Sequence, residues 1–334
     1  MVIIAILISN AYELSVHLYH ITILRTSSLN TFSTALIPIM VLIFIGYGLK
    51  RVRFLSDETW SGIEKLTYFI LFPALLIRTL GNQNLVGAPW PSMLLVVIGT
   101  LLISAAVLII FHQKIASESN ATFTSIFQGG VRFNTYIAFA LAQGLFGTDG
   151  LAMASIAAGF MIVLVNLLCI SAFVIWGKAT LKGIIPFIRE VAGNPLIIGC
   201  AIGWILSLSG IGLPGITEDI LEIIGRAALP FGLLAVGAAL KPEMIRGHMK
   251  PIAISSIVQF GLKPITAALL ISYTGLTGIA AGVLIIAFMT PTAPSAYILA
   301  RQLGGDTETM ASIITFQTLL AFLIMPLIAQ VLLN

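Results

Sequence analysis

A long apolar segment of the chain is interrupted at its centre by the stretch Gln128-Gly129-Gly130-Val131-Arg132-Phe133-Asn134-Thr135-Tyr136. A later apolar segment is interrupted in the same way by Met289-Thr290-Pro291-Thr292-Ala293-Pro294-Ser295-Ala296-Tyr297. Two interrupted helices at corresponding places in the two halves of a membrane chain are typical of a transporter's binding site. This interpretation requires that the rest of the sequence forms a membrane protein with two related halves.

Composition places the chain among membrane proteins. Of its 334 residues, 58% are hydrophobic and only 9% are charged, whereas a soluble protein carries about 25% charged residues. The charges flank apolar runs of roughly 20 residues, the length needed to cross the hydrocarbon core. The net charge of +4 is dispersed over alternate loops, so it does not indicate nucleic-acid binding.

The apolar runs predict an all-α polytopic protein with ten transmembrane helices joined by short connections. The connections leave no room for a soluble domain. The predicted spans run approximately over Phe32–Lys50, Ile63–Leu80, Trp90–Phe111, Ala121–Phe146, Leu151–Trp176, Asn194–Leu208, Asp219–Leu240, Met249–Tyr273, Leu276–Arg301 and Thr307–Leu333.

Residues 1–30 form an N-terminal extension that we do not expect to span the membrane. It lacks the basic region and the small-residue cleavage site of a signal peptide. Farther along, Gly147 and Gly304 suit the left-handed backbone at helix ends, and Asp149 and Asp306 suit helix N-caps. We expect Asn194 to start the sixth span, and Glu222 and Arg226 to pair at (i, i+4).

Basic residues gather in alternate loops, which predicts the orientation. Loops rich in Lys and Arg stay in the cytoplasm. We therefore expect a multi-pass protein of the cell (cytoplasmic or inner) membrane, with both ends of the ten-helix core outside. The basic residues concerned are Lys50, Arg51, Arg53, Lys114, Lys178, Lys182, Arg189, Lys241, Arg246, Lys250 and Arg301.

The chain contains an internal repeat. Asp149 and Asp306 lie 157 residues apart in similar turns, and Pro73 and Pro230 show the same offset. Helices one to five then correspond to helices six to ten. Because each copy has an odd number of helices, the second copy enters the membrane from the opposite side and is inverted. Chance recurrence of Gly-Asp turns is the alternative. The predicted organisation is a first repeat over 31–177, a basic cytoplasmic linker over 178–193 and a second repeat over 194–334.

Four residues are expected to break the fourth and ninth helices: Gly129, Gly130, Pro291 and Pro294. Non-helical backbone at membrane depth is tolerated only where protein or water satisfies it. The half-helices that resume after each break would aim their N–H groups at the crossing, which favours an anion. Ordinary proline kinks are the alternative interpretation.

Two basic residues lie deep in the predicted spans. Arg132 is roughly 16 Å along its helix and Lys263 roughly 20 Å along the eighth span, at ~1.5 Å per residue. We find no acidic residue at comparable depth, so an anionic substrate would supply the missing partner. The alternative is that each long side chain extends to an interface.

Polar residues around the breaks complete the candidate site, whereas enzyme signatures are missing. Gln128, Gln259 and Gln317 could line a path, although hydrogen bonding between helices is the commoner role. No motif for catalysis, a metal or a cofactor is present, and Cys169 and Cys200 suit inert packing. The candidate substrate-binding residues are Arg132, Asn134, Thr135, Lys263, Thr290, Thr292 and Ser295.

At these residues the chain resembles the auxin efflux carrier family, whose bacterial members are often called malate or malonate permeases. The resemblance covers roughly Leu36 to the C-terminus. It rests on Arg132-Phe133-Asn134-Thr135-Tyr136, Ala192-Gly193-Asn194-Pro195-Leu196, Ala228-Leu229-Pro230-Phe231-Gly232-Leu233-Leu234 and Tyr297-Ile298-Leu299-Ala300-Arg301-Gln302-Leu303-Gly304-Gly305-Asp306.

The resemblance implies two inverted five-helix repeats with broken, crossing fourth and ninth helices and an elevator-like transport cycle. It also implies that Asn134 contacts substrate, and that Lys263 takes the place of a basic residue that relatives carry before a proline. Plant members carry proline just before the crossing asparagine, whereas this chain has Phe133.

Together these patterns predict a secondary carrier of a small organic anion, such as a dicarboxylate or an auxin-like carboxylate. Export driven by the membrane potential needs no coupled ion. The alternatives are a sodium- or proton-coupled symporter of the bile-acid type, and a non-transporting membrane sensor or assembly partner. An intramembrane enzyme is the third alternative. The expected partners are the substrate and the lipid bilayer, with a homodimer left open and no nucleic acid.

Overall fold

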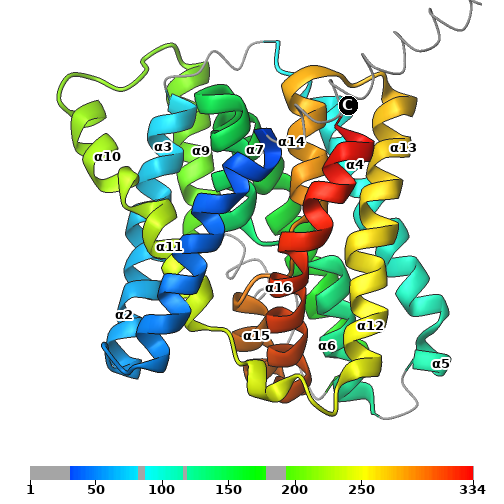
Figure 1. Cartoon of the computed structure of the whole chain (residues 1–334). Helices are drawn as coiled ribbons and strands as arrows, with labels where there is room; N and C mark the ends of the chain where they lie inside the picture. The colour runs from blue at the N-terminus through cyan, green and yellow to red at the C-terminus, as the bar shows by residue number, and fades with distance from the viewer. Residues whose placement is uncertain (1–30, 82–86, 116–118, 178–192, 334) are drawn as a thin grey trace, which may run out of the picture.

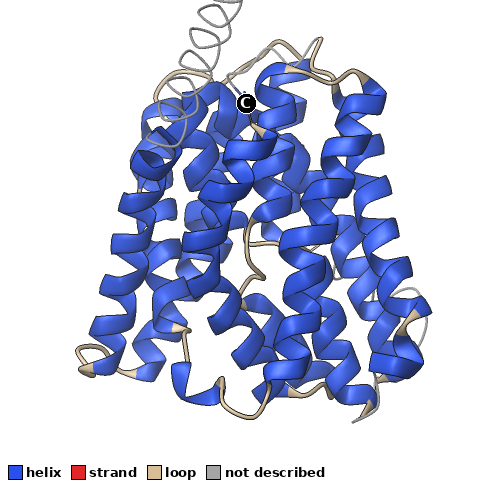
Figure 2. Ribbon diagram, turned by 45° about the vertical axis from the view of Figure 1, so that its right-hand side comes forward, coloured by secondary structure: helices blue, strands red, loops and turns tan. Residues whose placement is uncertain are grey.

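The computed structural model describes residues 31–81, 87–115, 119–177 and 193–333, which are helical and contain no strand (Figures 1 and 2). The expected extension over 1–30 and nearly all of the linker over 178–193 lie outside the described residues. The first helix covers Thr31–Arg51. The others are α2 Asp57–Leu66, the π-helical turn η1 Thr67–Leu71, α3 Phe72–Gly81, α4 Trp90–Ile110, α5 His112–Ile115, α6 Asn120–Val131, α7 Thr135–Trp176, α9 Pro195–Leu208, α10 Thr217–Arg226, α11 Ala228–Ala238, the 3-10 turn η2 Pro242–Met244, α12 Met249–Ile257, the π-helical turn η3 Val258–Leu262, α13 Lys263–Thr274, α14 Gly278–Met289, α15 Ser295–Leu303 and α16 Thr307–Leu332.

Six helical segments of the described chain are long and apolar enough to cross a membrane, and two shorter helices are also apolar. This length and composition make the chain a multi-pass membrane protein. The range Asn120–Trp176 contains both the expected fourth span and the expected fifth span, with a non-helical residue, Gly147, between them. The expected ninth span is shortened by its break. The six are Thr31–Arg51, Trp90–Ile110, Asn120–Trp176, Thr217–Ala238, Met249–Thr274 and Thr307–Leu332, and the shorter two are Pro195–Leu208 and Gly278–Met289.

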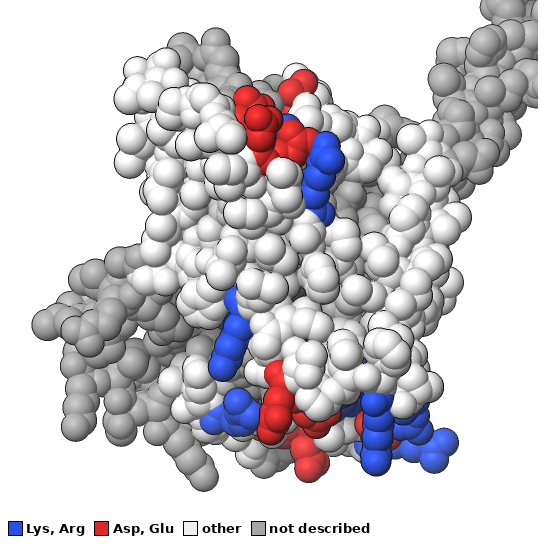
Figure 3. All heavy atoms as spheres, turned by 90° about the vertical axis from the view of Figure 1, so that its left-hand side faces the viewer, with Lys and Arg blue, Asp and Glu red and all other residues white. Residues whose placement is uncertain are grey.

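Charged side chains gather toward the two ends of the molecule on the face drawn in Figure 3, and the surface between them is largely uncharged. At one end, Arg78 of α3 pairs with Glu222 of α10 at 2.9 Å, and Glu222 also pairs with Arg226 one turn away, as expected. Figure 1 places α10 at this end and α2, α5 and α15 toward the other. An uncharged middle suits the hydrocarbon layer.

The helices pack as two groups that α7 connects (Figure 1). We call the first the α3 group. It contains the first helix with α2, α3, α9, α10 and α11. We call the second the α6 group. It contains α4, α6, α12, α13, α14, α15 and α16, whereas α7 contacts α3, α9 and α11 on one side and α4, α6 and α14 on the other.

Glycines bring helices of the α3 group into backbone contact. A Cβ atom on Gly237 of α11 would lie 1.9 Å from the carbonyl oxygen of Ile43, and one on Gly46 would lie 2.1 Å from that of Leu234. Small residues permit this close approach between membrane helices. The first helix and α11 are therefore held together along their backbones.

Gly304 and Asp306 have the predicted conformations, whereas Gly147 has a positive φ but not the left-handed helical ψ. Gly147 interrupts α7 with φ 63° and ψ −149°, which separates the expected fourth and fifth spans. Gly304 is left-handed at φ 74°, and Asp306 caps α16 by accepting a hydrogen bond from Thr309 N. Asp149, expected to cap likewise, is exposed and lies inside the range of α7, without a capping bond.

Candidate functional site

The fourth span breaks between α6 and α7. Arg132 (φ −70°, ψ 167°) and Asn134 (φ −96°, ψ 101°) are extended, and α7 starts at Thr135. The Asn134 side-chain oxygen accepts hydrogen bonds from the N–H groups of Tyr136 at 3.0 Å and Ile137 at 3.2 Å. An Asn with this geometry is an N-cap, so the polar residue itself starts the second half-helix.

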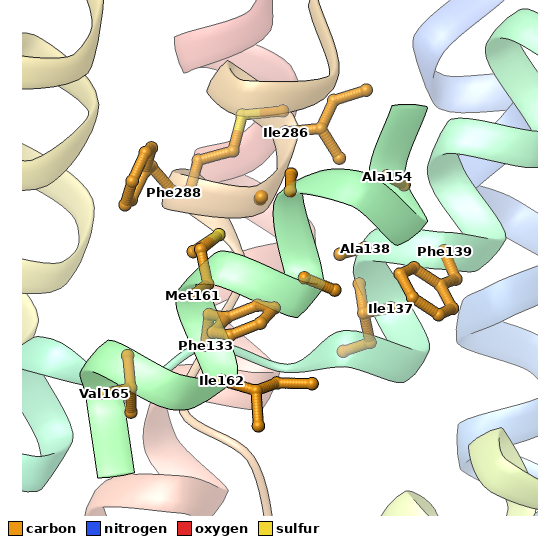
Figure 4. Close-up of a cluster of buried hydrophobic side chains, with 14 of the residues drawn as sticks. Phe133, Ile137, Ala138, Phe139, Ala154, Met161, Ile162, Val165, Ile286 and Phe288 are labelled. Carbon is orange, nitrogen blue, oxygen red and sulfur yellow. The ribbon is translucent and has the colours of Figure 1, made fainter. Parts of the chain in front are cut away.

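The apolar neighbour of this cap anchors the break. Phe133 is 5% exposed and lies beside Met161 and Ile162 of α7, in a buried cluster that extends to Phe288 of α14 (Figure 4). The backbone therefore leaves the helix here without a proline at position 133.

The ninth span breaks between α14 and α15. Thr290 is extended at φ −72° and ψ 150°, Pro291 follows outside any helix, and Pro294 immediately precedes Ser295, the first residue of α15. The position of both prolines agrees with the prediction. Proline cannot donate a backbone hydrogen bond, so each lies where the helix is open.

The two breaks are in contact with each other. Asn134 N donates to Thr290 Oγ1 at 3.2 Å, and Thr292 Oγ1 donates to the carbonyl oxygen of Gly129 at 2.9 Å. Gln128 of α6 reaches the carbonyl oxygen of Ala296 in α15 at 3.4 Å. Figure 2 shows non-helical segments in the middle of the helical bundle. The interrupted segments thus cross at its centre.

The two glycines do not break the helix, and this corrects the expectation for Gly129 and Gly130. Both lie within the last turn of α6, and the break begins at Arg132. A Cβ atom on Gly129 would lie 2.7 Å from Ile313 Cγ2, and one on Gly130 would lie 3.0 Å from Leu108 Cδ1. The glycines instead allow neighbouring helices to approach the crossing.

Lys263 closes the open end of α6. Its side chain is 0% exposed. Its ammonium group donates to the carbonyl oxygens of Val131 at 3.3 Å and Arg132 at 2.8 Å, and to Gln259 Oε1 at 2.9 Å. Lysine has three N–H donors, so all of them are used within the protein. Lys263 therefore brings charge to the crossing but has no hydrogen bond left for a ligand.

Gln259 connects Lys263 to the second break. Its side-chain nitrogen donates to the carbonyl oxygen of Thr290, while its side-chain oxygen accepts from Lys263. Gln259 lies in the π-helical turn η3 and Lys263 directly follows that turn. Such turns are frequent at functional sites. One helix thus satisfies freed carbonyls of both breaks.

Gln317 of α16 makes a similar link from the other side. Its side-chain oxygen accepts from Thr292 N at 3.0 Å, and its nitrogen donates to the carbonyl oxygen of Gly129 at 2.9 Å. Gln128, Gln259 and Gln317 are all fully buried. Each bonds across helices, which is the commoner of the two roles considered from the sequence.

Arg132 is the second cation of the crossing. Its guanidinium donates to Gln128 Oε1 at 3.3 Å and to Asn166 Oδ1 of α7 at 3.2 Å, and the residue is half-buried. None of the ion pairs within the described ranges includes Arg132 or Lys263. An arginine carries five N–H donors, so Arg132 retains donors beyond these two.

The predicted site residues differ in their access to solvent. Asn134, Lys263, Thr290 and Thr292 are fully buried. The Asn134 side-chain nitrogen is buried with no hydrogen-bond partner among the described residues. In contrast, Arg132 and Thr135 are half-buried and Ser295 is exposed. A ligand approaching the crossing would meet these three first.

The sequence did not single out Tyr136 as a site residue. Its ring stacks on Phe72 of α3, with centroids 4.6 Å apart and an interplanar angle of 19°, and it also lies against Gly232 of α11. The residue next to Thr135 therefore contacts the α3 group. The crossing lies where the two helix groups meet.

Comparison with known proteins identifies the family. The family described as "Membrane transport protein" matches residues 31–182 and 178–329, which together cover most of the chain. An uncharacterised transporter of Methanothermobacter thermautotrophicus is 22% identical over 304 residues, covering 89% of this chain and 97% of the relative. An uncharacterised transporter of Methanocaldococcus jannaschii is 23% identical over 303 residues, with the same coverage.

Proposed function

The chain belongs to the membrane transport protein family, which includes the auxin efflux carriers, and we propose that it carries a small organic anion across the membrane. The observation that supports this most strongly is the charge at the crossing. Lys263 and Arg132 meet at the α6 end of the first break, and no described acidic side chain pairs with either. A cation at membrane depth is costly unless a partner or a function compensates it.

The two cations have different roles in this proposal. Lys263 is saturated by protein oxygens and acts through its charge alone. Arg132 has spare N–H donors at a half-buried position, so it binds the carboxylate directly. Thr135 and Ser295, at the starts of α7 and α15, add hydroxyl and N–H donors at positive helix ends.

Three buried members complete the proposed site. Asn134 Nδ2 has an unused donor beside the crossing, which a carboxylate oxygen would accept. Thr290 and Thr292 already bond Ala287 O and Gly129 O through their hydroxyls. Their role is to hold the broken backbone in place for the ligand.

The proposed architecture is ten transmembrane helices in two inverted repeats, over 31–177 and 194–334. The shared offset of 157 residues between Asp149 and Asp306 and between Pro73 and Pro230 supports this organisation. Alternating access would move the α6 group, with the crossing, against the α3 group in an elevator-like cycle. The contact of Tyr136 with Phe72 and Gly232 would then be remade in each cycle.

The proposed orientation places the basic end in the cytoplasm. Lys50 lies at the end of the first helix, Lys241 precedes η2 and Arg301 lies in the last turn of α15, and Lys- and Arg-rich loops remain cytoplasmic. An inside-negative potential favours anion exit by ~2.3 kcal/mol per charge per 100 mV. We therefore propose export of a dicarboxylate such as malate, or of an auxin-like monocarboxylate.

Sodium-coupled uptake is the second candidate, because freed backbone carbonyls at broken helices can hold sodium. Against it, Lys263 already occupies two freed carbonyl oxygens at the α6 end, those of Val131 and Arg132. A sensor or assembly protein without transport is the remaining alternative. It predicts ligand binding without flux.

A thermal-shift screen of the purified protein against small carboxylates tests the proposal. Malate, malonate, succinate and indole-3-acetate are compared with neutral amides of matched size. We expect stabilisation by at least one carboxylate and by none of the amides. Equal responses to acids and amides, or none to either in a folded protein, would contradict an organic-anion site.

A further inference from the structure

The ammonium group of Lys263 is held in the manner of a bound metal cation. Its ligands are two successive backbone carbonyls, Val131 O and Arg132 O, and one amide oxygen of Gln259, at 2.8 to 3.3 Å. The Phe288 ring centroid lies 6.0 Å away, within cation–π range. All of these ligands are uncharged oxygens or an aromatic face, so the charge of Lys263 is not neutralised by a carboxylate.

The place of this group in the fold is equally specific. Val131 is the last residue of α6 and Arg132 is its C-cap, so the ammonium lies on the negative end of the α6 dipole. In transporters with discontinuous helices, unwound carbonyls and the C-terminal ends of half-helices coordinate the coupling cation. Lys263 reaches the same kind of position from a neighbouring helix.

We propose that Lys263 is a tethered cation that replaces a coupling ion, and that its removal exposes a binding site for a free monovalent cation. The ligands would be Val131 O, Arg132 O and Gln259 Oε1, with Phe288 beside them. In this proposal the protein itself supplies the cation at the crossing, so Na⁺ or K⁺ is not needed there. The role of Lys263 in transport extends the proposed function as an anion carrier and rests on it. The cation site itself does not depend on which anion is carried.

The buried carbonyl oxygens at the end of α6 need a donor or a cation beside them. Two carbonyls at a helix end cannot be left without donors inside a membrane. Gln259 is also committed, because its nitrogen already donates to Thr290 O. Removing the ammonium thus leaves three preorganised oxygens, and a small cation that loses its water can occupy them.

Two substitutions at this residue separate a vacated cation site from simple loss of packing. Lys263→Ala removes the ammonium and leaves room for an ion. Lys263→Met removes the ammonium but fills the space with an apolar side chain of similar length, and is the matched control. Thermal unfolding of wild type and both variants is measured in NaCl, KCl and N-methylglucamine chloride at equal ionic strength.

We expect the wild type to unfold at the same temperature in all three salts. Lys263→Ala should unfold at lower temperature in N-methylglucamine and gain about 3 °C or more in NaCl or KCl, whereas Lys263→Met should gain nothing. Stabilisation of the wild type by Na⁺ or K⁺ over N-methylglucamine would overturn the proposal, whether or not the variants fold. No response of folded Lys263→Ala to either ion would also overturn it.

Flux in proteoliposomes separates failure of this inference from failure of the proposed function. If the wild type carries a carboxylate equally well with and without Na⁺, and Lys263→Ala requires Na⁺ or K⁺, the tethered-cation role is supported. Absence of flux in all proteins would contradict the proposed carrier, while the thermal measurements would still decide the cation site.

Discussion

The Lys263 ammonium nitrogen lies 2.8 Å from the carbonyl oxygen of Arg132. One basic residue thus closes the helix that the other terminates. The two basic residues are linked by a hydrogen bond from the Lys263 ammonium to the backbone carbonyl of Arg132, with no anion between them. Gln259 extends the contact to Thr290 in the second break. This arrangement explains how the buried Lys263 and the half-buried Arg132 coexist at the centre of an apolar bundle, and it gives the predictions below.

Replacing Arg132 should weaken anion binding without unfolding the protein. Arg132→Ala removes charge-assisted hydrogen bonds worth about 1.5–3 kcal/mol, so the Kd for the best carboxylate should rise at least ~10-fold, as measured by calorimetric titration. Arg301→Ala, an exposed arginine of α15, is the control and should leave the Kd unchanged. Equal Kd values for wild type and Arg132→Ala would remove Arg132 from the site.

Restoring the ninth helix should impair turnover. Pro291→Ala with Pro294→Ala supplies two backbone donors and favours a continuous helix through the crossing. We expect flux to fall several-fold in proteoliposomes. Pro326→Ala is the control, because Pro326 lies inside the continuous helix α16. Normal flux in the double variant would make both prolines incidental.

Breaking the Gln259 link should destabilise the crossing. Gln259→Leu leaves Thr290 O without its donor and removes one oxygen from Lys263. Each buried unsatisfied group costs about 1–3 kcal/mol. Chemical unfolding should show this loss, while Gln143→Leu, at an exposed glutamine of α7, should be near neutral. Equal stability of the two variants would argue against the link.

The packing role of the glycines in α6 gives an independent prediction. Gly129→Ala would place a Cβ 2.7 Å from Ile313 Cγ2 and 2.9 Å from Ser255 Cβ, and overpacking costs about 1–3 kcal/mol. Gly62→Ala, where nothing lies within 4 Å, is the helical control and should be neutral or slightly stabilising. The difference in free energy of unfolding between the variants measures the effect.

Asp306 should stabilise the protein in a pH-dependent way. Burial raises its pKa, but hydrogen bonds from Thr309 and Thr122 outweigh burial and hold the pKa below the ordinary 3.8. A carboxyl with a lowered pKa stabilises the folded state above its unfolded pKa, and this contribution is lost as the pH falls through the folded value.

Asp306→Asn should therefore lower the unfolding temperature at pH 7, and the difference from wild type should shrink below about pH 4. Thermal unfolding from pH 7 to pH 3 provides the measurement. Asp149→Asn, at the exposed residue in the related turn, serves as control and should show little effect. A difference for Asp306→Asn that stays constant with pH would contradict this role.

Several features of the crossing could be predicted from the sequence, because their causes are local. Proline cannot continue a helix, so Pro291 and Pro294 mark the second break. Asn194 precedes a proline at a helix start, and it accepts hydrogen bonds from Leu196 N and Ile197 N as an N-cap. Arg132 stood out because charge is rare in apolar segments.

Other features depend on tertiary contacts that the sequence pattern does not contain. Low helix propensity suggested that Gly129 and Gly130 break α6, but neighbouring Ile313 and Leu108 explain them instead. The three oxygens around Lys263 come from two segments more than a hundred residues apart in sequence. The sequence therefore indicated a buried lysine but not that its donors are already used.

The measurement that tests the central claim most directly is carboxylate flux through purified protein in proteoliposomes, with the membrane potential clamped and Na⁺ replaced by N-methylglucamine. The account predicts flux in the direction that the potential drives the anion, independent of Na⁺, and lost in Arg132→Ala but retained in Arg301→Ala. Flux that requires Na⁺, or that is unchanged in Arg132→Ala, would contradict it.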